Sequence, residues 1–286
     1  MNKFEILSDS CLDLPGELVA RFGIGIAPLR VVYDENTEFD DGTMEHPDFY
    51  NGIRQGKMPQ TSAVNPEGWK KLMKPALNDG RDVLVLTVSS GLSTTYQSAV
   101  IAAGELEEKY PERKILVVDS LSASVGLGLL VYHAVRLREE GKTLEEVHSW
   151  LENQKLHVCH WVTVNDLMHL KRGGRVSAAT AVVGTMLQIK PVLIMDNEGR
   201  LATVAKARGR KAAMEKLVEK YVETGIPGAN DVVIVGHGDC PEDARMLEQM
   251  LKEQGVKQVI TSYVGNVIGA HTGPDVLVIV FLGTAR

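Results

Sequence analysis

Short apolar runs alternate with helix-forming segments in the first half of the chain. The strand candidates are Phe4–Leu7, Ile26–Tyr33, Val83–Val88 and Ile115–Val118. The last two runs are almost continuously apolar, which is typical of strands buried on both faces of a parallel sheet. Helical patterns cover Ser98–Tyr110 and Ala123–Glu140; Gly141 ends the second, and a capping box from Thr143 to Glu146 starts another helix. This order predicts an α/β domain with a doubly wound, mostly parallel sheet.

The pattern changes at about residue 156, after which strand candidates become more frequent. They are Leu156–Val164, Val192–Met195, Leu201–Lys206, Val232–Gly236, Val259–Val264 and Val276–Leu282. The turn residues Asn197–Gly199 predict a hairpin, and two amphipathic helices are expected over Gly209–Glu223 and Pro241–Glu253. We therefore predict two domains, an α/β domain over residues 1–155 and an α+β domain over residues 156–286.

Length and composition are consistent with two domains of a soluble protein. The chain has 286 residues, of which 44% are apolar, and its formal net charge of −6 argues against non-specific nucleic-acid binding. Three widely spaced cysteines give no disulfide framework and fit a reducing compartment. The longest apolar run, Val276–Leu282, is too short for a membrane span, and the N-terminal residues lack a signal-peptide pattern. We expect a cytoplasmic protein without stable membrane insertion.

Small polar residues follow three of the strands predicted in the first half. They are Ser8–Ser10, Ser89–Gly91 and Asp119–Ser120. Ligands of open α/β sheets bind outside the carboxyl ends of the strands, so these residues predict a binding site. Serine and aspartate also cap helices, and the same residues often do both.

The hydroxyl-rich run Thr87–Ser98 raises the possibility of a serine nucleophile. A hydrolase elbow needs a serine between two glycines, a pattern that neither Ser90 nor Ser93 has. A base such as His271 could be supplied only by the fold. An esterase or acyl-transfer enzyme that uses Ser93 with His271 therefore remains the alternative hypothesis. Phosphate-binding loops are disfavoured, because Gly141-Lys142-Thr143 joins two helices and has no upstream glycine in register.

Other polar clusters allow both structural and functional interpretations. The segment His157–His160 cannot form one metal cluster in a strand, because alternation places Cys159 and His160 on opposite faces; we expect no metal site. Glycines at Gly126 and Gly128 are expected to permit close helix packing. Two basic clusters, Lys171–Arg175 and Lys206–Lys211, could form a docking face for an acidic partner, or a nucleic-acid-binding module as a further rival.

The glycine-rich segment Gly265–Pro274 is expected to be a loop that displays His271 near its tip. A histidine buried in the core is the competing interpretation of the same residue.

Seven motifs occur in order along nearly the whole chain. They are Ser8–Pro15, Pro59–Ser62, Ser89–Ala99, Val118–Ser120, Leu170–Ser177, Ile189–Pro191 and Ile268–Pro274. In this combination the sequence resembles the DegV family of fatty-acid-binding proteins. The resemblance implies a two-domain α/β protein that encloses one long-chain fatty acid in an apolar tunnel between the domains, with no cofactor.

The resemblance also implies roles for individual residues at matching motif positions. Thr61, Ser62, Ser93 and His271 would bind the carboxylate. A wider head-group or partner network would comprise Ser89, Ser90, Gly91, Thr94, Arg172 and Gly269. Hydroxyl donors suit this task, because a buried carboxylate is costly unless it is hydrogen-bonded.

In the bacterial fatty acid kinase system, similar proteins present the bound acid to a separate ATP-using subunit that makes an acyl-phosphate. The resemblance therefore implies a kinase partner and no catalysis by the chain itself. Two departures from the family pattern stand out, because Thr94 and Asp275 occupy positions where the family usually has glycine. Either residue is expected to affect head-group geometry or partner choice.

Overall fold

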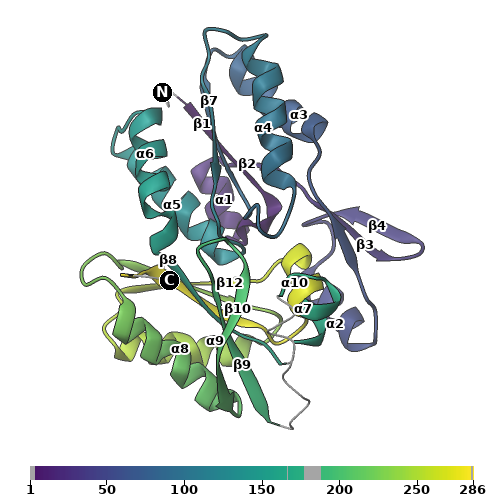
Figure 1. Ribbon diagram of the computed structural model, residues 1–286, viewed down its shortest axis with the longest axis vertical. Helices are drawn as coiled ribbons and strands as arrows, with labels where there is room; N and C mark the ends of the chain where they lie inside the picture. Colours follow the sequence, from purple (N-terminus) through teal and green to yellow (C-terminus); the bar gives the residue numbers. More distant parts are fainter. Residues whose placement is uncertain (1–3, 166, 177–187, 285) are drawn as a thin grey trace.

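The computed structural model describes residues 4–165, 167–176, 188–284 and 286, which form two main sheets joined by a shared helix (Figure 1). The first sheet is fully parallel. Its strands, in spatial order, are β2 (Gly25–Ala27), β1 (Phe4–Asp9), β6 (Asp82–Thr87) and β7 (Ile115–Asp119). One face is covered by α3 (Pro66–Asn78) and α4 (Thr95–Glu107), and the other by α1 (Gly16–Phe22), α5 (Val125–Glu139) and α6 (Leu144–Gln154).

The second sheet has six strands and mixed direction. Their spatial order is β10 (Leu201–Arg208), β9 (Ile189–Met195), β8 (Val158–Thr163), β13 (Leu277–Leu282), β11 (Val232–His237) and β12 (Gln258–Tyr263). Neighbouring strands are antiparallel except for β11 and β12. The helices α8 (Arg210–Thr224) and α9 (Pro241–Glu253) cover one face, and α5 packs against the other.

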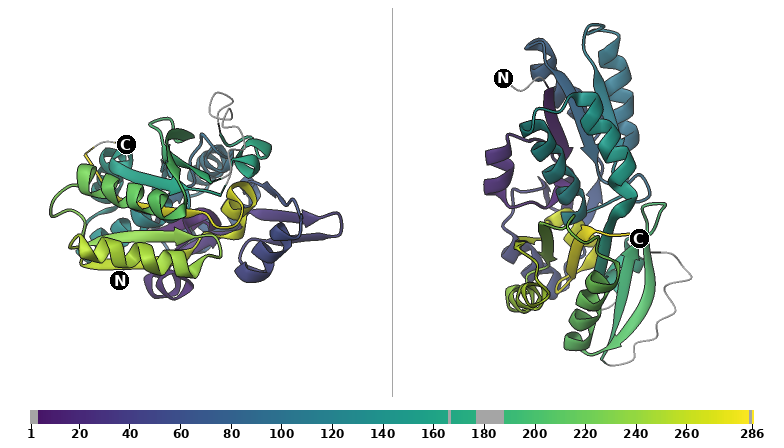
Figure 2. Two further views of the ribbon diagram at one scale, coloured as in Figure 1. Left: turned by 90° about the horizontal axis from the view of Figure 1, so that it is seen from below. Right: turned by 90° about the vertical axis from the view of Figure 1, so that its left-hand side faces the viewer.

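A small antiparallel sheet projects from the body of the molecule (Figure 2). It consists of β4 (Thr37–Asp40), β3 (Arg30–Asp34) and β5 (Gln60–Ser62). The remaining elements are α2 (His46–Arg54), α7 (Met168–Arg172), α10 (Asn266–Thr272) and the 3-10 turns η1 (Ser10–Leu12) and η2 (Lys155–His157). In Figure 1, α2, α7 and α10 lie together near the base of this projecting sheet.

The predicted fold class is confirmed, because a parallel α/β sheet is followed by a second, sheet-rich unit. All six strands of the second sheet lie after residue 155, and the exact domain boundary stays a prediction. The single strand expected over Ile26–Tyr33 is wrong: the run divides into β2 and β3, which belong to different sheets. Pro28 lies between them, and proline cannot donate a hydrogen bond to a strand ladder. The loop expected over residues 265–274 is also wrong, because it contains α10.

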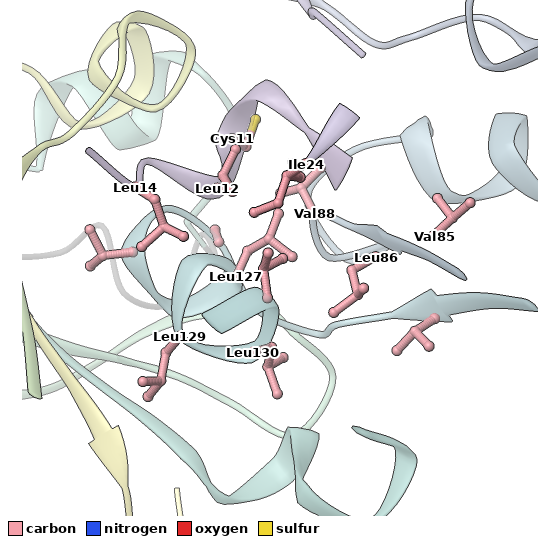
Figure 3. Close-up of a cluster of buried hydrophobic side chains, with 14 of the residues drawn as sticks. Cys11, Leu12, Leu14, Ile24, Val85, Leu86, Val88, Leu127, Leu129 and Leu130 are labelled. Atoms are coloured by element: carbon pink, nitrogen blue, oxygen red, sulfur yellow. The ribbon is translucent and has the colours of Figure 1, made fainter. Parts of the chain in front are cut away.

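Helix α5 is the packing centre of the molecule, since it contacts strands of both main sheets. Its residues from Val125 to Val135 are buried apart from the half-buried His133. A helix that is apolar on all sides needs such enclosure. Figure 3 shows Leu127 and Leu130 of this helix gathered with Leu12 and Val88 of the first half.

Two glycines of α5 permit this close packing, as predicted. A Cβ atom at Gly128 would lie 2.4 Å from the carbonyl oxygen of Leu12, and one at Gly126 would lie 1.8 Å from His160 Nε2. His160 is only 3% exposed, so its ring would have to shift within the interior to make room for the added atom. The approach of α5 to the second sheet therefore depends on Gly126.

We expect Gly126→Ala to lower the free energy of unfolding by about 1–3 kcal/mol, because overpacking a tight contact forces side chains away from their preferred rotamers. Urea unfolding measures the change. Gly104→Ala on α4 is the matched control, since a Cβ atom there meets nothing within 4 Å. It should stabilise the protein by up to about 1 kcal/mol. Equal destabilisation by both substitutions would contradict this account of Gly126.

Candidate functional site

A cavity of about 500 Å³ lies where the carboxyl ends of β1 and β6 meet the second sheet. This volume is in the usual range for small-molecule sites. Most of the wall is aliphatic and comes from both halves of the chain. Its apolar residues include Val88, Val162, Leu170, Met195, Leu201, Val264, Val267, Ile268, Val276 and Val278. The position agrees with the expectation that a ligand binds outside the ends of the parallel strands.

Polar side chains interrupt this apolar wall in places, and one group of them forms a polar patch. Thr61 Oγ1 of β5 and His271 Nε2 of α10 are hydrogen-bonded at 2.8 Å. Ser93 lies in the turn before α4, where its Oγ atom is 2.9 Å from Thr95 Oγ1 and accepts a bond from the Thr95 backbone N–H. Three segments far apart in sequence thus supply hydroxyl and imidazole groups to one cavity.

Arg175 adds a positive charge to the same patch. Helix α7 ends at Arg172, Gly174 adopts a left-handed φ of 68°, and the Arg175 N–H donates to the carbonyl of Leu170 at 3.1 Å. This is the Schellman arrangement, which turns the chain back on itself after a helix. Arg175 therefore points inward, and its Nε–H donates to the carbonyl of Leu92 at 3.3 Å.

Contacts connect these residues into a continuous patch. Gly173 packs against His271, since a Cβ atom at Gly173 would lie 2.4 Å from His271 Nδ1. Arg175 also donates to the Gly173 carbonyl. Through Leu92, the patch reaches Ser93, the next residue along the chain. The resulting surface can offer a charged donor and several neutral donors to one anion.

Burial is the larger cause, and the positive charge of Arg175 the smaller one, that together lower the pKa of His271 to about 4. The imidazole is therefore neutral at pH 7, with one N–H donor and one acceptor nitrogen. The patch presents the guanidinium as its charged group and keeps the imidazole as a polar partner for Thr61.

The structure brings six of the predicted site residues to the cavity: Thr61, Ser90, Gly91, Ser93, Thr94 and His271. Their roles toward a ligand stay predictions.

Four other predicted residues lie outside the lining, each for a local reason. Ser62 follows Thr61 in β5 and is exposed, because successive strand residues point to opposite faces. Ser89 is buried, and its hydroxyl donates to the Gly199 carbonyl at 2.7 Å. Gly269 packs against Tyr50, whose hydroxyl oxygen would lie 2.6 Å from an added Cβ atom. Arg172 is exposed on α7.

Arg175 lines the cavity and is absent from the residues that motif matching predicts, as are the lining residues Ser124, His160 and Thr272. The sequence signal was available in the glycine pair, because Gly173-Gly174 predicts a helix end with a reversal of chain direction. Such a reversal separates the directions of Arg172 and Arg175, which would share one face of a continuing helix.

The two departures from the family pattern lie in different settings. Thr94 is exposed at the cavity rim, as the residue that precedes α4. Asp275 does not line the cavity; its carboxylate pairs with Arg54 at 3.1 Å and accepts a bond from Asn165. The φ of Asp275 is 63°, a left-handed value that glycine adopts without strain.

The hydrogen bonds of the serine and histidine do not form the dyad that the esterase alternative requires. His271 Nε2 pairs with Thr61, whereas Ser93 Oγ pairs with Thr95. An activated serine needs its hydroxyl within reach of the base. The esterase alternative stays an untested hypothesis without support from this arrangement.

Other predicted surface and metal features can be placed as well. Among residues 4–165, 167–176, 188–284 and 286, no group of three or more His, Cys, Asp or Glu side chains could hold a metal ion. No helix in the same residues has the length and apolar character needed to cross a membrane. In the second basic cluster, Arg210 pairs with Asp243 at 2.8 Å and Lys211 with Glu215 at 3.9 Å, which reduces its net positive charge.

Comparison with known proteins gives matches along essentially the whole chain. The family model described as "Uncharacterised protein, DegV family" matches residues 3–284. A DegV domain-containing protein of Clostridium perfringens is 40% identical over 290 residues, which cover 100% of this chain and 99% of that protein.

Solved structures agree with these matches. A DegV lipid binding protein from Thermotoga maritima has 33% identity and a TM-score of 0.87, over 99% of each chain. A DegV family protein from Thermus thermophilus, described by its fatty acid binding, has 31% identity and a TM-score of 0.87, over 98% of this chain and 99% of that one. DegV of Bacillus subtilis, a fatty acid binding protein, has 27% identity and a TM-score of 0.85, over 99% of this chain and 100% of that one.

We expect Arg175→Met to raise the pKa of His271 from about 4 toward its ordinary value, because the substitution removes a nearby positive charge. The rise should be incomplete, since burial, the larger cause, remains. Titration of the His271 ring by NMR measures it. Arg172→Met is the control and should leave the His271 pKa unchanged; the reverse ranking of the two variants would show that Arg175 is misassigned.

Proposed function

Because the chain belongs to the DegV family, we propose that it binds one long-chain fatty acid in the cavity between its two main sheets. The observation that carries this proposal is the polar patch of hydroxyl, imidazole and guanidinium groups in a cavity whose wall is mostly aliphatic. Thr61, Ser93, His271 and Arg175 would hold the carboxylate, and the aliphatic wall would hold the tail. We further propose that residues 1–155 and 156–286 form the two domains that enclose it.

The tail and the head group of a bound fatty acid would contribute differently to the free energy of binding. Each methylene removed from water contributes about 0.8 kcal/mol, so a tail of about fifteen carbons supplies roughly 12 kcal/mol before the costs of association. The carboxylate opposes binding unless its lost hydration is replaced. Arg175 is the strongest of the four candidate partners, because its donor is itself charged and a guanidinium can bond both carboxylate oxygens at once.

The head group would also be the part offered to a partner. We propose that a separate ATP-dependent kinase subunit phosphorylates the bound carboxylate, and that this chain contributes no catalytic residue. The support is the setting of α7, where the inward Arg175 lies three residues from the outward Arg172. Cations on the rim of an interface mainly accelerate association with an acidic surface.

Native mass spectrometry of the purified protein, followed by denaturation and lipid analysis, tests the binding proposal. We expect one fatty acid per chain, released on unfolding, or one taken up when oleate or palmitate is added. An empty protein that takes up neither acid would contradict the proposal.

Ser93→Ala should weaken fatty-acid binding by about three- to tenfold, because it removes one neutral hydrogen-bond donor from the head-group patch. Isothermal titration with oleate measures the affinity. Ser62→Ala removes a hydroxyl from the neighbourhood of Thr61 but outside the cavity, and should change the affinity less than twofold. Equal losses in both variants, or none in Ser93→Ala, would rule out the proposed role of Ser93.

Arg172→Ala should keep fatty-acid affinity and slow acyl-phosphate formation by about three- to tenfold, because it removes a rim charge from the proposed kinase contact. Hydroxylamine trapping with ATP and the kinase subunit measures the rate. The difference in rate between Arg172→Ala and the unchanged protein should shrink at high salt. Salt screens the attraction that the Arg172 charge provides in the unchanged protein. Lys211→Ala, in the second basic cluster, is the control. An unchanged rate in Arg172→Ala would remove this residue from the kinase contact.

A further inference from the structure

The neighbouring strands β8 and β9 separate before either strand ends. Their ladder stops at the pair formed by Trp161 and Ile194. Beyond this pair, β8 stays paired with β13 as far as Val158, and β9 stays paired with β10 through Met195. In the register of the ladder, the next pair would be His160 with Met195. Both residues are buried and line the cavity, so the opening between the two strands forms part of the cavity wall.

The side chain of Arg286 spans this opening. Its Nε–H donates to the carbonyl of Val158 in β8 at 3.1 Å, and its Nη1 donates to the carbonyl of Asp196, the residue after β9, at 3.0 Å. In the register of the ladder, Val158 and Asp196 are within one residue of opposite positions. The guanidinium therefore joins the two strands where backbone hydrogen bonds between them have ended.

The same guanidinium also joins the second sheet to the first half of the chain. Nη1 donates to the Leu121 carbonyl at 2.8 Å, and Nη2 donates to Ser122 Oγ at 3.0 Å. These two residues follow β7 and directly precede Ala123 of the cavity wall. Nη2 also donates at 2.5 Å to the carbonyl of Lys155, in the turn η2 before β8. Three separate segments of the chain thus meet at one side chain.

Arginine is well suited to this set of bonds. A guanidinium has five N–H donors in one plane, and each donor of Arg286 has its own acceptor. A lysine ammonium has only three donors and lacks the planar arrangement. Since every N–H of Arg286 is already used within the protein, its arrangement suits holding the chain rather than binding a ligand.

We propose that Arg286 is a positioning residue that closes the opening between β8 and β9, and thereby holds Ala123, His160 and Met195 in place as one section of the cavity wall. His160 is also tied to this arrangement through Val158, whose carbonyl accepts a bond from His160 Nδ1–H at 3.2 Å. The link to lipid binding rests on the proposed function, under which this section would face the bound fatty acid. A wall that is fixed in advance reduces the entropy lost on binding.

Methionine oxidation tests the closure of the opening without lipid. Met195 is 2% exposed, and Met73 of α3, which is 0% exposed, is the internal control. Arg286→Leu removes all five donors. We expect hydrogen peroxide to oxidise Met195 about tenfold faster in this variant and Met73 at an unchanged rate, because a local opening exposes only the groups beside it. Mass spectrometry of proteolytic peptides measures both rates.

Two results of this experiment would overturn the proposal. Equal acceleration at both methionines would mean that the substitution lowers global stability rather than opening the wall locally. An unchanged oxidation rate of Met195 would mean that the opening is closed without Arg286.

Three further variants make the test more specific. Arg286→Lys keeps the charge but has fewer donors, and should also accelerate oxidation of Met195; full protection by lysine would contradict the need for a guanidinium. Arg200→Leu changes an exposed arginine of the β9–β10 hairpin, which pairs with Glu198 at 3.2 Å, and should leave the rate unchanged. If Arg286→Leu does not fold, Ser122→Ala removes one acceptor and should accelerate oxidation of Met195 alone, by about twofold.

Release of oleate tests the link to lipid binding. We expect Arg286→Leu to release bound oleate about tenfold faster than the unchanged protein, and Arg200→Leu to release it at the unchanged rate. Equal release rates in Arg286→Leu and the unchanged protein would overturn this link. Failure of the unchanged protein to bind oleate would contradict the proposed function, and the methionine oxidation would still decide the role of Arg286.

Discussion

The hydrogen bond between Thr61 Oγ1 and His271 Nε2 joins residues 210 positions apart, and the polar patch depends on it. Thr61 belongs to the small projecting sheet of the first half, whereas His271 belongs to a short helix between the last strands. Neither element is part of a main sheet, so neither is fixed by a long strand ladder. The patch therefore exists only when the two halves of the chain pack together, with α5 between them.

Charge is distributed unevenly around this packed centre. Arg175 donates to the carbonyls of Leu92 and Gly173, and within the described residues it forms no salt bridge. A partly buried cation without a counter-ion costs free energy, which a carboxylate ligand would recover. On the other side of α10, burial raises the pKa values of Asp9, Asp13 and Asp41, so the acidic groups resist ionisation.

Periodicity predicted the main sheets well, because long buried strands leave strong patterns. The runs at residues 83–88 and 276–282 became β6 and β13 within a residue or two. The projecting sheet was missed, since β5 has only three residues and its pattern of side chains is set by contacts with β3. The glycines of residues 265–274 predict a loop in place of α10, because glycine weakens helix propensity, whereas in the structure Gly265 and Gly269 make room for Asp13 and Tyr50.

In the candidate site too, local sequence predicts some residues, whereas others come together only through contacts between distant parts of the chain. Ser93 follows a predicted strand, so its place at the sheet edge could be expected from local sequence. The pairing of Thr61 with His271 depends on contacts 210 residues apart, which periodicity does not encode. Arg175 was accessible to reasoning about the Gly173-Gly174 turn, but motif position favoured Arg172. Turn geometry was the better guide, because side-chain direction after a helix is set by the backbone reversal.

The hydroxyl-rich run after β6 illustrates why many polar groups need not mean catalysis. Thr87 donates to the Val118 carbonyl at 3.4 Å, Ser89 donates to Gly199, and Ser93 pairs with Thr95. These bonds connect the turn before α4 to its neighbours and fix the positions of the hydroxyls that line the cavity. Fixed donors reduce the entropy lost when a ligand binds, whereas a nucleophile must also reach a base. Under the proposed function, the run would hold a head group in one position, which is the property that presentation to a second protein requires.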